Sequence, residues 1–213
     1  MNKTLLSLCL LTFFFSCKTD SKKTAITEAS LAEPAEKEWI TLFDGTSLDG
    51  WRGYNMDSLP PGWVIEDGAI AFNTKLGMEQ DYEGGVDILY GKEEFENFEL
   101  YLEWKLPEGG NSGIFYHVKE GYKSVPEVAP EYQLIDDENY ATIHDISEYK
   151  LSLGYTENPG ELKPLLSTAA DYAMHPTDPG KTMHPAGEWN SSRIVFTPER
   201  VEHWLNGEKV VSF

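Results

Sequence analysis

Apolar and polar residues alternate with a period of two along most of the chain from Trp39 onward. This period is typical of β-strands, because successive side chains of a strand point to opposite faces of its sheet. Over residues 98–105 four large apolar side chains alternate with polar ones, which predicts a strand with one buried and one solvated face. Residues 192–196 show a similar pattern and predict another strand.

Two segments, 63–72 and 201–213, predict β-hairpins. Each has apolar-rich stretches on both sides of a turn dipeptide, Asp67-Gly68 in the first and Asn206-Gly207 in the second. Such dipeptides favour two-residue hairpin turns, since both central positions need a positive φ. Helical periodicity is scarce, and the best candidate for short helical turns is the polar connection 137–149.

Many short strands separated by Gly and Pro favour an all-β fold, a sandwich or jelly roll of antiparallel strands. The connection 156–187 is rich in Pro, Gly, His and Asp and has no clear periodicity, which is typical of functional or disordered segments. The sequence stops at Phe213, within the returning strand of the last predicted hairpin. We therefore expect the domain over residues 38–213 to be C-terminally incomplete.

The N-terminus predicts an export signal. A lysine at position 3 precedes an apolar run from Leu5 to Phe15, and Ser16-Cys17 follow it. This layout favours a lipoprotein signal over residues 1–17, with cleavage before Cys17 and acylation of that cysteine; the alternative is an ordinary secretory signal cleaved nearby. Residues 18–37 have few apolar anchors and predict a flexible tether. We expect a cell-envelope protein, in the periplasm or at the cell surface, that meets the membrane only through its lipid.

Composition excludes several classes of function. The chain has a formal net charge of −19, so nucleic acid is an improbable partner. The two cysteines are Cys9 and Cys17, so the predicted mature domain has neither a disulfide nor a cysteine-ligated metal. His-Glu-x-x-His, phosphate-loop and Gly-x-Ser-x-Gly motifs are all absent from the sequence.

Polar residues that could carry chemistry lie on two of the predicted strands. In the segment 130–137, alternation places Glu131 and Gln133 on one face and Tyr132 and Leu134 on the other. In the segment 111–117, a small-residue turn opens into an apolar strand that ends in His117. An acid, an amide and an imidazole on neighbouring strands suggest a site, although the solvated face of any antiparallel sheet carries polar residues too.

Six motifs follow one another along the chain, at residues 39–51, 63–68, 111–116, 130–133, 186–190 and 203–207. Together they resemble the 3-keto-disaccharide hydrolase domain family, also described as 3-keto-glucoside 1,2-lyase or 3-keto-2-hydroxy-glucal hydratase. The resemblance implies a concanavalin A-like jelly roll that acts on 3-keto-glycosides or 3-keto-disaccharides by base-assisted elimination, hydration or both.

The same resemblance implies roles for individual residues. Glu131 is expected to be the base or a metal ligand, and Glu103 the second catalytic carboxylate. Asp136, His144 and His203 are expected to hold a divalent cation that polarises the ketone. Each of these residues could equally serve the fold, as a solvated strand residue, a turn cap or a core side chain. The expected contacts to the sugar come from Asn111, His117, Gln133, Arg193 and Trp204.

Two other carbohydrate-related functions remain as alternatives. A two-carboxylate glycosidase on a jelly roll would place its acids at alternate positions of one strand. Here Glu99 and Glu103 are four residues apart, and Tyr101 occupies the alternate position between them. A non-catalytic carbohydrate-binding domain could use the same fold and the same aromatic residues. Acids converging in one pocket would favour the enzyme, and a flat aromatic platform would favour the binding domain.

Overall fold

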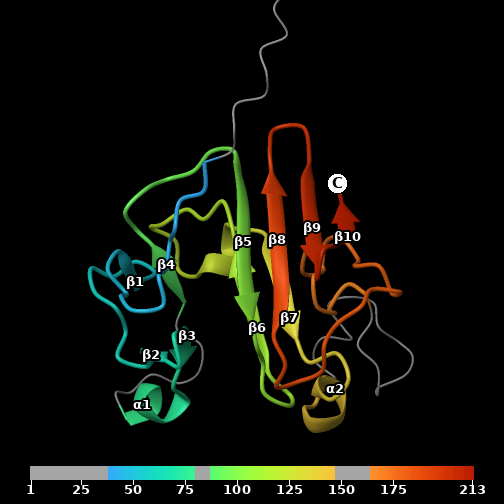
Figure 1. The fold of residues 1–213 in the computed structure, drawn as a ribbon, viewed down its shortest axis with the longest axis horizontal. Coiled ribbons are helices and arrows are strands. Elements are labelled where there is room, and N and C mark those ends of the chain that lie inside the picture. The colour runs from blue at the N-terminus through green and yellow to red at the C-terminus, as the bar shows by residue number, and fades with distance from the viewer. Residues whose placement is uncertain (1–37, 80–86, 147–163) are drawn as a thin grey trace, which may run out of the picture. The chain divides into compact units, whose positions relative to one another are not determined.

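Four antiparallel strands form the largest sheet of the computed structural model, in the order β10-β9-β8-β5 (Figure 1). The structure describes residues 38–79, 87–146 and 164–213. The hairpin β9–β10 turns at Asn206 and Gly207, both with positive φ, so the predicted turn is confirmed. The strands span Phe98–Trp104 (β5), Asn190–Phe196 (β8), Val201–Leu205 (β9) and Glu208–Ser212 (β10).

A second layer lies behind this sheet in the view of Figure 1. It consists of β6 (Asn111–Phe115) and β7 (Glu131–Ile135), which pair antiparallel. On the other side of β7, the backbone of residues 169–172 continues the layer: Gln133 donates to Ala170 O at 3.0 Å, and Ala169 donates to Gln133 O at 2.8 Å. Strand β7 therefore has a hydrogen-bonded neighbour on both sides.

Two small sheets and three short helical segments complete the described fold. Strand β2 (Trp63–Glu66) pairs with β3 (Ala69–Phe72) across the predicted Asp67-Gly68 turn, and β1 (Trp51–Gly53) pairs with β4 (Ile88–Tyr90). The helix predicted within 137–149 forms as a single turn, as far as the described residues extend. The helical segments are α1 (Thr74–Glu79), the 3₁₀ turn η1 (Val125–Glu127) and α2 (Tyr140–Ile143).

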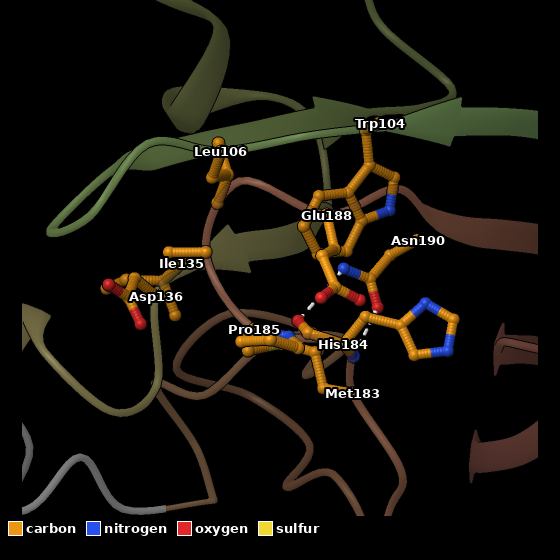
Figure 2. A pocket seen from close by; sticks show the side chains of 10 residues that line it. Trp104, Leu106, Ile135, Asp136, Met183, His184, Pro185, Glu188 and Asn190 are labelled. Atoms are coloured by element: carbon orange, nitrogen blue, oxygen red, sulfur yellow. Dashed lines mark hydrogen bonds between the residues drawn. The ribbon is translucent and has the colours of Figure 1, made fainter.

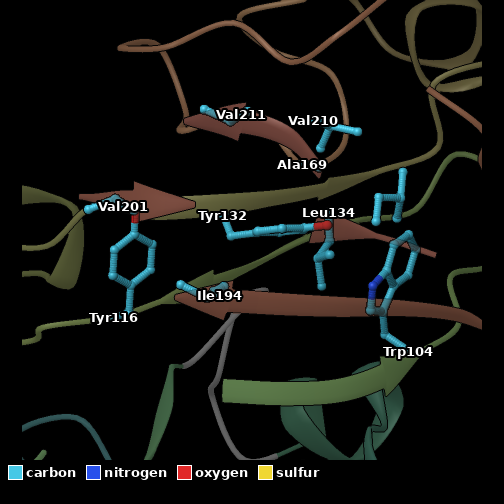
Figure 3. Packing of buried hydrophobic residues seen from close by; sticks show 10 residues of the cluster. Trp104, Tyr116, Tyr132, Leu134, Ala169, Ile194, Val201, Val210 and Val211 are labelled. Atoms are coloured by element: carbon cyan, nitrogen blue, oxygen red, sulfur yellow. The ribbon is translucent and has the colours of Figure 1, made fainter. Parts of the chain in front are cut away.

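The main core lies between the four-stranded sheet and the β6–β7 layer (Figure 3). Trp104 and Ile194 reach it from the first sheet, and Tyr132 and Leu134 from the second. The Trp104 indole N–H donates to Ser192 Oγ at 2.8 Å, so this buried polar group has a partner. The prediction of an all-β sandwich of antiparallel strands is thus confirmed.

His203 is fully buried in this core, and both of its ring nitrogens are hydrogen-bonded. Nδ1 lies 2.8 Å from Ala169 O and must donate to that carbonyl, so Nε2 accepts the Tyr116 hydroxyl at 2.9 Å. Burial lowers the pKa of His203 to about 4. The residue is therefore a neutral hydrogen-bonding element of the core.

Other predictions concern the chain ends and the connections. The predicted signal 1–17 and tether 18–37 lie outside the described residues, as does the part of 156–187 that precedes Pro164. From Pro164 onward that connection packs along β7 through the backbone bonds given above. A helix long and apolar enough to cross a membrane is not found among the described residues.

The bond between Tyr116 and His203 gives the first testable prediction. Tyr116→Phe removes the donor and leaves His203 Nε2 buried without a partner, so we expect the free energy of unfolding to fall by about 1–3 kcal/mol. Tyr101→Phe is the matched control, because Tyr101 is exposed, and its cost should stay within about 0.5 kcal/mol. Urea denaturation of both variants measures this, and equal losses would contradict the assigned bond.

Candidate active site

Glu131 lies on the face of β7 that points away from the main core. Register pairs Phe115 with Glu131 and Gly113 with Gln133, so these four side-chain positions share that outward face. The Glu131 side chain lies across Gly113: a Cβ added there would be 1.9 Å from Glu131 Oε1. A glycine is needed at position 113 because the carboxylate fills the space that a side chain would take.

The surroundings of Glu131 favour its protonated form. Its pKa is raised to about 7, first because the carboxyl is largely desolvated and then because Asp87 and Asp171 are nearby. Among the residues that the structure describes, none donates a hydrogen bond to the Glu131 carboxylate or forms an ion pair with it. A carboxyl group with a pKa close to neutrality can both take up and return a proton.

Asp87 and Asp171 are parts of this site that the sequence analysis missed. Asp87 directly precedes β4, and burial raises its pKa. Asp171 is 3% exposed, and its Oδ2 lies 2.7 Å from His175 Nδ1, while Oδ1 has no partner among the described residues. Asp171 lies in a stretch without periodicity, where no pattern indicates that its backbone will align beside β7.

Asn111 and Gln133 share the outward face with Glu131, but only Asn111 is open to solvent. Asn111 is exposed at the start of β6, where it can still contact a sugar. Gln133 is 4% exposed, and its side-chain oxygen accepts the Leu134 N–H at 3.0 Å. Gln133 therefore shares the face of Glu131, but its side chain is buried and is not open to a sugar.

His117 is directed away from Glu131. Its backbone φ of 54° ends the strand alternation of β6, and its ring stacks on Phe196 with centroids 4.9 Å apart. Phe196 packs against the main core from β8. The prediction that His117 belongs to the same site as Glu131 is not supported by this orientation.

Glu103, Arg193 and Trp204 lie on the outer face of the four-stranded sheet. Their neighbours in sequence, Trp104 and Ile194 among them, fill the core, so alternation directs these three side chains to the opposite side of that sheet. The full thickness of the sandwich thus separates them from Glu131. The structure therefore does not place Glu103, Arg193 or Trp204 beside Glu131.

The predicted metal ligands do not gather either. Asp136 accepts the Gly109 N–H and the Asn139 side-chain N–H, both at 2.8 Å, so it caps a turn. His144 Nε2 lies 3.0 Å from Gly109 O, and both nitrogens of His203 are occupied in the core. The described residues contain no group of three potential ligands that could hold a metal ion. Asp136 and His144 thus both contact Gly109, whereas His203 lies in the core, so the structure does not bring the three together.

Asp136 also borders a small cavity near the end of the sandwich (Figure 2). The cavity has a volume of about 10 Å³, which is the least that a single water molecule needs. Its wall includes Trp104, Met183 and Asn190, and Figure 2 shows the His184 ring turned away from Asp136. This cavity is too small for a sugar.

Comparisons with known proteins agree on one family. Residues 38–213 match the model of the 3-keto-alpha-glucoside-1,2-lyase-like domain. A 3-keto-disaccharide hydrolase of Bacteroides thetaiotaomicron is 38% identical over 196 residues, which are 86% of this chain and 61% of that protein. A solved structure from Parabacteroides distasonis, assigned as a glycosyl hydrolase, is 38% identical and superimposes with a TM-score of 0.66 over 81% of this chain and 70% of its own.

Because the pKa of Glu131 is raised, we expect the difference in stability between wild type and Glu131→Gln to depend on pH. The folded protein binds the Glu131 proton more tightly than the unfolded chain, so wild type loses stability as pH rises from 4.5 to 7. Glu131→Gln cannot ionise. The variant should match wild type near pH 4.5 and exceed its free energy of unfolding by up to about 3 kcal/mol at pH 8.

Urea denaturation of both proteins at each pH measures this difference. Comparing the two at the same pH cancels the titration of other groups, His203 included. Curves that remain parallel from pH 4.5 to 8 would contradict the raised pKa.

Proposed function

The chain belongs to the 3-keto-alpha-glucoside-1,2-lyase-like domain family, and from this premise we propose that it cleaves 3-keto-glycosides or 3-keto-disaccharides with Glu131 as the base. One observation carries the proposal. A carboxyl group with a pKa of about 7 lies on the outward face of β7, with no cation or hydrogen-bond donor assigned to it among the described residues. A carboxylate that served only the fold would be expected to have such a partner.

The chemistry follows from the position of the ketone. Oxidation at C3 acidifies the proton on C2, because removal of that proton gives an enolate delocalised onto the ketone oxygen. Glu131 takes the proton, the electron pair reforms the ketone, and the bond from C1 to the glycosidic oxygen breaks. The leaving alcohol takes up a proton. Water then adds across the new double bond, so the sum of the two stages is a hydrolysis.

The pKa of Glu131 suits this step. A base with an ordinary glutamate pKa would be ionised at neutral pH but would bind the C2 proton weakly, whereas a pKa near 7 combines a large ionised fraction with greater basicity. Asp87 and Asp171 serve here as charges that keep the pKa of Glu131 high. Asn111 is a predicted sugar contact that lies on the same face as Glu131 and is exposed.

A divalent cation remains a prediction from the resemblance. The described residues offer no ligand set for it, so no step above passes through a metal. Export likewise remains a proposal: the apolar run 5–15 followed by Ser16-Cys17 supports a lipoprotein held in the cell envelope through Cys17. Within this proposal, the enzyme would act on sugars outside the cytoplasm.

Turnover of a 3-keto-glucoside with a chromogenic alcohol tests the proposed base. We expect Glu131→Gln to lower kcat/KM by about 10²–10⁴-fold, and Glu103→Gln to leave it unchanged, since Glu103 lies on the opposite side of the sandwich. In wild type kcat/KM should rise with pH and level off above 7, because the base must be ionised. A substrate deuterated at C2 should show a primary isotope effect.

Two outcomes would contradict the proposal: turnover that survives in Glu131→Gln, or cleavage without an effect of deuterium at C2. Loss of activity on addition of a chelator would bring the cation back into the mechanism. Sugar binding without turnover in any variant would favour the non-catalytic carbohydrate-binding domain.

The glycine beneath the carboxylate gives a second test of the site. Gly113→Ala places a Cβ where Glu131 Oε1 lies, so the carboxylate must move, and we expect kcat/KM to fall by at least about tenfold with the fold retained. Gly180→Ala is the matched control, since its Cβ would meet only Asp178 Oδ1 at 3.3 Å. Full activity of Gly113→Ala would show that the position of Glu131 does not matter.

A further inference from the structure

The outer face of the four-stranded sheet carries a row of side chains that the proposed reaction does not use. Register aligns Tyr101 with Arg193, Arg193 with Trp204, and Trp204 with Lys209, one residue from each strand. Aromatic rings and cations therefore alternate across all four strands. This set of four residues is called the outer row below.

A groove runs along three members of the outer row, Tyr101, Arg193 and Trp204. It has a volume of about 380 Å³, against about 10 Å³ for the cavity beside Asp136, and is therefore large enough for a sugar ring. Tyr101, which is 51% exposed, and Trp204 provide aromatic surface along the groove. The remaining lining residues are Ser191, Arg193, Asn206 and Gly207.

Arg193 is held rigidly in this groove. Its guanidinium carbon lies 4.8 Å from the centroid of the Trp204 ring, and its Nε donates to Glu99. No other described residue accepts a hydrogen bond from the two terminal nitrogens of Arg193. A planar group that is fixed in this way presents two donors with little further loss of side-chain entropy on binding.

Acceptors and donors lie beside this guanidinium. The exposed carboxylate of Glu103 is next along β5 and accepts the Tyr101 hydroxyl at 3.2 Å. Ser191 stands opposite Glu103 on β8. Aromatic surface flanked by fixed donors and acceptors is complementary to a sugar ring, which has apolar C–H faces and hydroxyl groups around its edge.

The charges in the groove indicate an uncharged ligand. Arg193 pairs with Glu99, and Lys209 and Arg200 share Glu202. With the exposed carboxylate of Glu103 on the same face, the charges of these six side chains balance. The whole chain has a net charge of −19, which would repel a polyanion. A neutral glycan needs no unpaired cation, and the negative charge of the chain does not repel it.

We propose that the groove along the outer row is a second, non-catalytic binding site for a neutral oligosaccharide. It lies on the side of the sandwich opposite to Glu131, and it does not depend on catalysis there. Its effect would be to hold a glycan chain against the protein while the reactive sugar occupies the site at Glu131.

Titration of the full chain with cellotetraose and with maltotetraose, followed by saturation-transfer NMR and calorimetry, tests this proposal. At least one of these uncharged probes should bind to wild type in the millimolar range. Tyr101→Ala and Arg193→Lys should weaken binding by at least about tenfold, because the first removes an aromatic wall of the groove and the second replaces the planar guanidinium by an ammonium group. Tyr122→Ala is the matched control, since Tyr122 is 50% exposed and lies outside the groove.

The Glu131→Gln variant separates the two sites. It should bind the tetrasaccharide as wild type does, and Tyr101→Ala should turn over a small 3-keto-glucoside at the wild-type rate. Failure of turnover with tetrasaccharide binding intact would therefore count against the catalytic proposal alone.

Four results would overturn the second site: no binding of either tetrasaccharide, equal binding by Tyr101→Ala and wild type, loss of binding in Glu131→Gln, or tighter binding of dextran sulfate than of the neutral probes. Thermal melting of Arg193→Lys and Tyr101→Ala confirms that each variant is folded. Arg193→Lys keeps the positive charge, so a selective loss there points to the planar guanidinium.

Discussion

The alternation of side chains along β7 is the constraint on which the rest of this structure depends. It places Tyr132 and Leu134 in the main core and leaves Glu131 on the opposite face, while the backbone bonds on both sides of the strand prevent a shift of register. A shift by one residue would exchange the two sets and bury the carboxylate in the core. The stability of the sandwich and the position of Glu131 outside the main core are therefore set by the same strand.

The alternation of side chains also divides the polar residues between the two outward faces of the sandwich. Burial requires each sheet to direct one face inward, so the sandwich has two outward faces that do not meet. Glu131 lies on one of them, with a pKa raised by desolvation and neighbouring acids. Glu103 and the outer row lie on the other, where ion pairs balance the charges. One domain thus has two polar surfaces: one with a desolvated carboxyl group that is unpaired among the described residues, and one on which charged side chains form ion pairs.

Local patterns were sufficient to predict the strands, both hairpin turns and the outward position of Glu131. These patterns do not predict how the sheets stack. Alternation assigns a side chain to one face of its own sheet, but it does not say on which side of the sandwich that face lies. For this reason Glu103, Arg193 and Trp204 are grouped with Glu131 in the sequence-based prediction. Gln133 and His203 share a second cause of error. Each is a polar residue in an alternating strand, yet the segment around Ala169, whose position no pattern indicates, pairs with the backbone of Gln133 along the edge of β7 and accepts a hydrogen bond from His203.

The pKa of the Glu131 carboxyl group measures the central claim most directly. The side-chain carboxyl carbons can be labelled with ¹³C, the Glu131 resonance assigned as the one missing from Glu131→Gln, and its shift followed from pH 3 to 9. The account predicts a midpoint of about 7. A midpoint near 4.5, the ordinary value for glutamate, would show a solvated carboxylate and would contradict the account.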